Sequence, residues 1–115
     1  MQTVLVVEDE HIVRFATVAM LEDEGYVALE ADNATEAIRI LESRTDVRIV
    51  VTDVNMPGTM DGLKLAHYVR DRWPPIRLVV VSGRPSPGEL PGDAVFLGKP
   101  FSKDGLMKHL QSWST

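Results

Sequence analysis

Cysteine is absent from the 115-residue sequence. Disulfides, thiolate metal ligands and cysteine nucleophiles are therefore excluded, which agrees with a reducing compartment. No apolar run approaches the roughly 20 residues of a membrane-spanning helix. The first residues, Met1–Thr3, lack the basic flank and long apolar stretch of a signal peptide. We therefore expect a cytoplasmic protein that does not enter a membrane.

An excess of positive charge is also missing, since the formal net charge is −5. A nucleic-acid surface needs a basic face, so we expect no nucleic acid to bind this domain. The sequence also lacks a phosphate-binding P-loop, a dinucleotide-binding glycine fingerprint and a Gly-x-Ser-x-Gly nucleophile elbow. These absences argue against an NTPase, a dinucleotide-dependent enzyme and a serine hydrolase.

The sequence does contain alternating strand-like and helix-like segments. Its 44% hydrophobic and 25% charged residues are ordinary for a globular chain, and we expect one domain over residues 1–115. Predicted strands are Val4–Val7, Val27–Glu30, Arg48–Thr52, Arg77–Val81 and Ala94–Leu97. Predicted helices are His11 to about Glu24, a second capped by Asn33, a third from Asp61 to about Arg72, and a last one after Ser102. This alternation predicts an α/β fold with a doubly wound parallel sheet.

Two local expectations concern the first helix and the segment between the fourth and fifth strands. In the first helix, a 3.6-residue period places Val13, Ala16, Thr17, Met20 and Leu21 on the inward face. Between the fourth and fifth strands, residues 83–92 are rich in proline and glycine. A long regular helix is therefore not expected there.

Charged residues stand where three of the strands end. Glu8 and Asp9 follow the first strand, Asp53 follows the third, and Lys99 follows the fifth. Parallel strands bring such residues together at the carboxyl edge of their sheet. A single acid at a strand end can merely cap a helix, but three acids with a lysine favour a site for Mg²⁺ or Mn²⁺ and a phosphoryl group. We expect Asp9, Asp53 and the backbone carbonyl of Asn55 as metal ligands, with Glu8 acting through water.

Four segments carry a family resemblance: Val4–Glu10, Val50–Pro57, Val80–Gly83 and Lys99–Phe101. In this order, at the ends of strands one, three, four and five, they closely resemble the CheY-like receiver domain of two-component response regulators. The likeness covers essentially the whole chain. It implies a flavodoxin-like sheet of five strands in the order 2-1-3-4-5.

The resemblance also implies a function. Asp53 would accept a phosphoryl group from a sensor histidine kinase or a histidine phosphotransfer protein in a Mg²⁺-dependent reaction. Lys99 would neutralise the phosphoryl oxygens, and Ser82 would donate a hydrogen bond to one of them. The Lys99–Pro100 peptide bond would be cis. The domain would then signal to a protein target by conformational change. It would not be an enzyme, and at most it would slowly dephosphorylate itself.

Three departures from the family are visible. Phe96 stands where many members have a tyrosine that takes part in switching, so its role is either in the switch or in plain packing. Residues 83–92 are expected to give a shortened or irregular fourth helix, which alters the usual output face. The Met56–Gly62 segment is one residue longer than the common form of this loop.

Two other functions stay open on the sequence. An aspartyl-phosphate phosphohydrolase needs a second acid two residues after the nucleophile, and here that residue is Asn55, which cannot transfer a proton. A receiver-like interaction module would work without phosphorylation, although the complete set of charged residues argues against it. The chain is either a stand-alone regulator or a piece of a longer response regulator or hybrid kinase.

Overall fold

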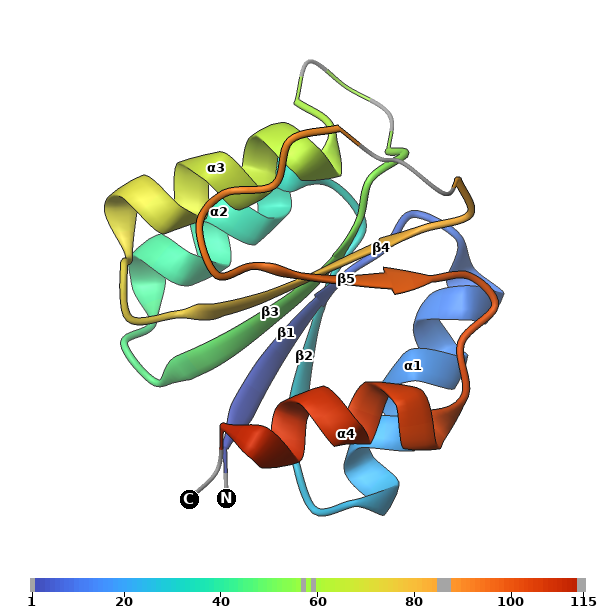
Figure 1. Ribbon diagram of the computed structural model, residues 1–115. Coiled ribbons are helices and arrows are strands. Elements are labelled where there is room, and N and C mark those ends of the chain that lie inside the picture. Colours follow the sequence, from blue (N-terminus) through green and yellow to red (C-terminus); the bar gives the residue numbers. More distant parts are fainter. Residues whose placement is uncertain (1, 57, 59, 85–87, 114–115) are drawn as a thin grey trace.

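The computed structural model describes residues 2–56, 58, 60–84 and 88–113. Five parallel strands form one sheet: β1 (Thr3–Val7), β2 (Val27–Ala31), β3 (Val47–Asp53), β4 (Arg77–Ser82) and β5 (Val95–Gly98). Their order in the sheet is β2-β1-β3-β4-β5 (Figure 1). The helices are α1 (His11–Asp23), α2 (Ala34–Ser43), α3 (Gly62–Arg72) and α4 (Lys103–Ser112). The doubly wound, flavodoxin-like fold and the predicted strand order are confirmed.

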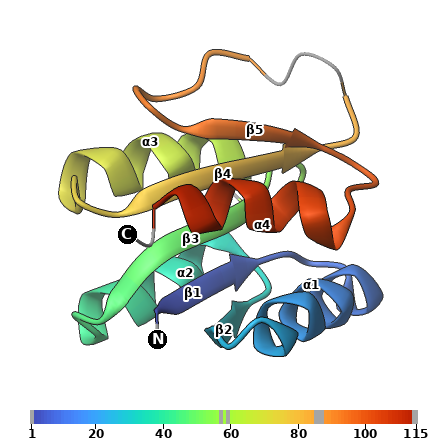
Figure 2. The same ribbon diagram turned by 60° about the horizontal axis from the view of Figure 1, so that its bottom comes forward.

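Helices cover both faces of the sheet. Figure 2 shows α4 in front of the sheet and α3 and α2 behind it, while α1 lies on the same side as α4. One core cluster joins α2 and α3 to Leu5, Val50 and Leu78. The other joins α1 and α4 to strand neighbours that point the opposite way, such as Val4 and Val51. Because successive side chains of a strand alternate between faces, continuous valine-rich strands fill both cores.

Local capping signals fix where three of the helices begin. Asn33, Asp61 and Ser102 each accept a hydrogen bond from the backbone N–H three residues later, at the starts of α2, α3 and α4. Such caps satisfy donors that the first helical turn leaves without a partner. The predicted starts of these helices are therefore confirmed.

The predicted inward face of α1 is partly wrong. Thr17 and Leu21 are buried as expected, but Ala16 is exposed and Val18 is buried in its place. The helix also exposes Ile12 by 85% and Phe15 by 75%. Apolar residues occur on every side of this helix, so their spacing alone could not select the face that packs on the sheet.

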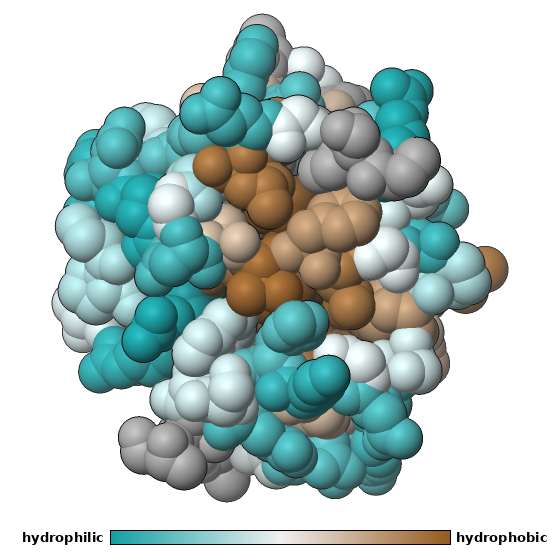
Figure 3. All heavy atoms as spheres, in the orientation of Figure 1, coloured by the Kyte–Doolittle hydropathy of each residue, from teal (hydrophilic) through white to brown (hydrophobic). Residues whose placement is uncertain are grey.

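The described residues between β4 and β5, 83–84 and 88–94, form no helix. Residues 88–93 instead lie along α3, where His67 Nε2 donates to the Glu89 carbonyl at 2.8 Å and Arg70 Nη2 donates to Asp93 at 2.6 Å. The first three residues of β5 are consequently only half-buried, whereas the last five of β4 are buried. Figure 3 shows hydrophobic side chains gathered in the middle of the face where β5 lies foremost. The expectation of an irregular segment is confirmed for the described residues.

In the part of the chain that the structure describes, no helix has the length and apolar character needed to cross a membrane.

Candidate functional site

The charged residues meet at the carboxyl edge of the sheet because of strand register. In the pairing of β1 with β3, Val7 lies opposite Thr52. The residue after Val7 is Glu8, and the residue after Thr52 is Asp53, so the two strands bring two acids side by side. Lys99 directly follows β5, and its backbone N–H donates to the Ser82 carbonyl at 2.8 Å, which fixes the lysine to the end of β4.

Three carboxylates form one cluster at this edge. One oxygen from each of Glu8, Asp9 and Asp53 lies within 4.8 Å of the others. Glu8 is only 4% exposed and Asp53 6% exposed, while Asp9 is half-buried. Buried carboxylates are costly unless a cation or hydrogen-bond donors compensate them, so this cluster requires positive charge nearby.

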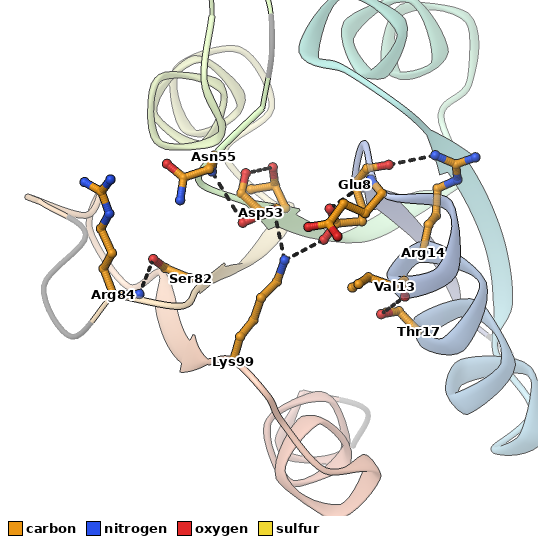
Figure 4. A network of polar contacts seen from close by, with 11 residues as sticks. Glu8, Val13, Arg14, Thr17, Asp53, Asn55, Ser82, Arg84 and Lys99 are labelled. Carbon is orange, nitrogen blue, oxygen red and sulfur yellow. Dashed lines mark hydrogen bonds and ion pairs between the residues drawn. The ribbon is translucent and has the colours of Figure 1, made fainter.

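Lys99 provides part of that charge by bridging two of the acids. Its Nζ lies 2.9 Å from Glu8 Oε1 and 2.9 Å from Asp53 Oδ2 (Figure 4). The other oxygen of Asp53 accepts from the Asn55 backbone N–H at 3.3 Å. The Lys99–Pro100 peptide bond is cis, the form that the family resemblance implies. The 2.9 Å contact with Asp53 Oδ2 directs the Lys99 ammonium group at the predicted phospho-acceptor.

The pKa values of two groups are shifted by these contacts. Burial raises the pKa of Glu8, and this effect outweighs the opposing hydrogen bond from Lys99. For Lys99, burial lowers the pKa, but its hydrogen bonds to Glu8 and Asp53 are together stronger and leave the pKa raised. Lys99 therefore keeps its proton and its positive charge throughout the physiological pH range.

The donor set fits a divalent cation. Glu8 and Asp53 each place one carboxylate oxygen on the Lys99 ammonium group, and Asp9 adds a third carboxylate beside them. Mg²⁺ prefers oxygen ligands and is held in proteins by one or two carboxylates plus waters and phosphate oxygens. Asp9, Asp53 and Glu8 are residues that could hold it. The predicted ligation by the Asn55 carbonyl stays a prediction, although the Asn55 backbone does contact Asp53.

Ser82 ends β4 beside the cluster and is buried. Its Oγ accepts a hydrogen bond from the Arg84 backbone N–H at 3.0 Å. Because the hydroxyl acts as the acceptor in this bond, its own proton remains available for donation. Phe96 lies half-buried on β5, opposite Val80 of β4, and its part in switching stays a prediction.

No expectation from the sequence pointed to Gly62, the first residue of α3. Its N–H donates to the Val54 carbonyl at 2.8 Å, and a Cβ built on it would lie 1.6 Å from the Asp53 carbonyl oxygen. Only glycine lets the start of α3 approach β3 this closely. A glycine directly after the capping Asp61 was the only signal available. The extra residue predicted in the Met56–Gly62 loop cannot be compared, because Pro57 and Thr59 lie outside the described residues.

Comparison with known proteins defines the family. Residues 4–111 match the response regulator receiver domain. The chain therefore belongs to the response regulator receiver domain family, whose members are signalling switches of two-component systems. It is 44% identical over 106 residues to the sensor kinase CckA of Brucella abortus, a match that covers 87% of this chain and 11% of the kinase. It is 38% identical over 86 residues to the aerobic respiration control protein ArcA of Escherichia coli, covering 73% of this chain and 35% of ArcA.

Solved structures give the same fold. The response regulator TrrA of Thermotoga maritima in complex with Mg²⁺-BeF superposes with a TM-score of 0.89 at 26% identity, covering 97% of this chain and 98% of TrrA. The chemotaxis protein CheY4 of Vibrio cholerae has a TM-score of 0.86 at 28% identity, with the same coverage of 97% and 98%. The chain thus matches these regulators nearly end to end, but it spans only about a tenth of CckA and a third of ArcA.

Proposed function

We propose that Asp53 accepts a phosphoryl group from a phosphohistidine of a sensor kinase or phosphotransfer protein in a Mg²⁺-dependent reaction. The observation that carries this proposal is the placement of the Lys99 ammonium 2.9 Å from Asp53 within the cluster of three acids. A cation beside a carboxylate nucleophile neutralises both the nucleophile and the negative phosphoryl group that it attacks.

The chemistry assigns a separate task to each residue. A carboxylate oxygen of Asp53 attacks phosphorus, the phosphorus–nitrogen bond breaks, and the histidine leaves with the electron pair of that bond. Lys99 contacts an equatorial phosphoryl oxygen as charge shifts toward it. A Mg²⁺ ion held by Asp9 and Asp53 supplies further neutralisation of the phosphoryl oxygens when bound. Glu8, held by Lys99 at 2.9 Å, keeps the ammonium group aligned.

Signalling follows from the hydrogen bond that Ser82 can donate once a phosphoryl oxygen is present. This bond exists only in the phosphorylated state, so it shifts the equilibrium between two arrangements of the β4 end and the residues after it. We propose that a protein target reads this change. The similar proteins include both a sensor kinase and a putative response regulator, which supports a histidine-phosphorylated partner.

Incubation with acetyl phosphate and Mg²⁺ tests the proposal. Intact-mass measurement should show one phosphoryl group per wild-type chain, decaying slowly, and none in Asp53→Asn. The matched control is Asp71→Asn, because Asp71 is an exposed aspartate of α3. A chain that stays unmodified would instead support the interaction module.

Rapid repeated turnover of acetyl phosphate without an accumulating adduct would support the phosphohydrolase. The residue two positions after Asp53 argues against that outcome. Asn55 is exposed and contacts Asp53 through its backbone N–H, and its side-chain amide cannot act as a general acid.

A further inference from the structure

Arg14 in the first turns of α1 makes three contacts around the start of the acid cluster. Its Nη1 donates to the Glu8 carbonyl at 2.8 Å (Figure 4). Its Nε donates to Glu30 Oε1 at 3.0 Å. Its Nη2 donates to His11 Nδ1 at 2.9 Å. The side chain is only 13% exposed, whereas its partner Glu30 is 52% exposed. A nearly buried guanidinium with three partners is held in one orientation.

The contact with Glu8 acts on the peptide group that joins the two acids. The Glu8 carbonyl belongs to the Glu8–Asp9 peptide, and the Glu8 N–H donates to the Ala31 carbonyl of β2 at 3.0 Å. Both backbone polar groups of Glu8 are therefore fixed, one by β2 and the other by Arg14. The side chains of Glu8 and Asp9 begin at the two Cα atoms that flank this peptide. Holding its carbonyl restrains ψ of Glu8 and φ of Asp9, and so restrains the backbone path that sets where the two carboxylates start.

We propose that Arg14 is a positioning residue for the divalent-cation site, acting through the Glu8–Asp9 peptide; this inference rests on the proposed function. Residues that orient ligands without touching the metal typically change metal affinity by about 10–100-fold when they are replaced. The guanidinium suits this task because its separate N–H groups form a rigid planar fork that serves several acceptors at once. Glu30 offsets the charge of Arg14, so the effect on a cation is geometric rather than repulsive.

Calorimetric Mg²⁺ titration of the purified chain measures the effect directly. We expect Arg14→Ala to weaken Mg²⁺ binding by at least about tenfold, at the lower end of the range for such orienting residues. Arg14→Lys should recover part of the affinity, because one ammonium group can reach the Glu8 carbonyl or Glu30 but cannot reproduce the fork. The matched control is Arg39→Ala, which removes an exposed arginine paired with Glu36 within α2 and should leave the Mg²⁺ affinity unchanged.

A second measurement separates positioning from general stabilisation. Mg²⁺ raises the melting temperature of any chain that binds it in the folded state, by an amount set by the ratio of its concentration to the dissociation constant. A purely structural Arg14 would lower the melting temperature without Mg²⁺ but preserve the Mg²⁺-induced rise. A positioning role reduces that rise in Arg14→Ala and partly restores it in Arg14→Lys.

The possible outcomes are distinct. If the wild-type chain binds no Mg²⁺, the proposed function fails, and this inference fails with it. If the wild type binds Mg²⁺ and Arg14→Ala binds it as tightly as Arg39→Ala does, only the inference is overturned. If Arg14→Ala does not fold, the comparison of Arg14→Lys with the wild type decides, and equal affinities would overturn the inference.

Discussion

Gly62 shows how one residue without a side chain can determine the shape of the site. The Asp53 carbonyl oxygen and the Thr52 hydroxyl both occupy space that a Cβ at this position would need, at 1.6 and 2.9 Å. Elsewhere, replacing a glycine in a helix by alanine is favourable by about 1 kcal/mol. Here the steric conflict is with backbone, which cannot rotate away as a flexible side chain could.

We therefore expect Gly62→Ala to lower the free energy of unfolding by about 1–3 kcal/mol, the usual cost of overpacking. It should also impair phosphorylation, because α3 can no longer approach the strand that carries Asp53. Urea unfolding and the acetyl phosphate assay measure the two effects. Gly92→Ala is the matched control, since a Cβ there meets nothing within 4 Å. Equal stability of the two variants would contradict this account.

Arg44 and Asp46 lie just before the start of β3, at the end of the sheet away from the acid cluster. Their ion pair gives a prediction about how stability depends on pH. Hydrogen bonds from Arg44 at 2.9 and 2.7 Å lower the pKa of Asp46 from 3.8 to about 2. Because the folded pKa is depressed, the contribution of this pair to stability is complete above about pH 4 and is lost as the pH falls toward 2. An NMR pH titration of the Asp46 carboxyl should show this low pKa, and Arg44→Gln should return it toward 3.8. An Asp46 titration that is the same in both proteins would refute the assignment of the shift to Arg44.

At the scale of elements, α1 has two distinct faces near the site. Thr17, Val18 and Leu21 pack inward, while Ile12 and Phe15, three residues apart, share an exposed apolar face. The helix begins two residues after Asp9. A protein that delivers a phosphoryl group to Asp53 must approach the carboxyl edge of the sheet and will therefore lie close to the start of α1.

We expect Phe15→Ala to slow phosphotransfer from a histidine-phosphorylated partner protein by roughly tenfold, the effect of losing an interface aromatic worth about 1.4 kcal/mol. Modification by acetyl phosphate should keep its wild-type rate, because a small donor needs no docking surface. Val27→Ala, which shortens an exposed apolar side chain of β2, serves as the control. If Phe15→Ala slows phosphorylation by the partner protein and by acetyl phosphate equally, the defect lies in the site and not in docking.

The segment between β4 and β5 shows how far local sequence can predict an irregular element. Its described residues run along α3, tied by His67 and Arg70, and leave β5 half-covered. Proline and glycine predicted this irregularity because neither supports a long helix. They could not predict the anchoring contacts, since His67 and Arg70 lie about twenty residues earlier in the chain and meet this segment only after α3 has packed.

At the scale of the whole molecule, we expect Ser82 to couple the site to the rest of the fold. We expect Ser82→Ala to be phosphorylated on Asp53 but to show a much smaller change in backbone amide exchange around β4 and β5 than the phosphorylated wild type. In the proposed function the Ser82 hydroxyl makes its hydrogen bond to a phosphoryl oxygen only after phosphorylation, so we expect its removal to uncouple modification from response. Ser43→Ala, at the exposed end of α2, is the control. An unchanged exchange response in Ser82→Ala would exclude this coupling.

The amino-acid sequence by itself determined the α/β class, the strands and the edge at which Glu8, Asp9, Asp53 and Lys99 meet. These follow from short-range patterns, because apolar runs, caps and the alternation of elements need no knowledge of distant contacts. The tertiary structure alone decided which face of α1 is buried, how Lys99 bridges two carboxylates, why Gly62 must be glycine and what Arg14 holds. Each of these depends on contacts between different helices, strands and loops, and only the packing of the helices against the sheet fixes the distances in those contacts.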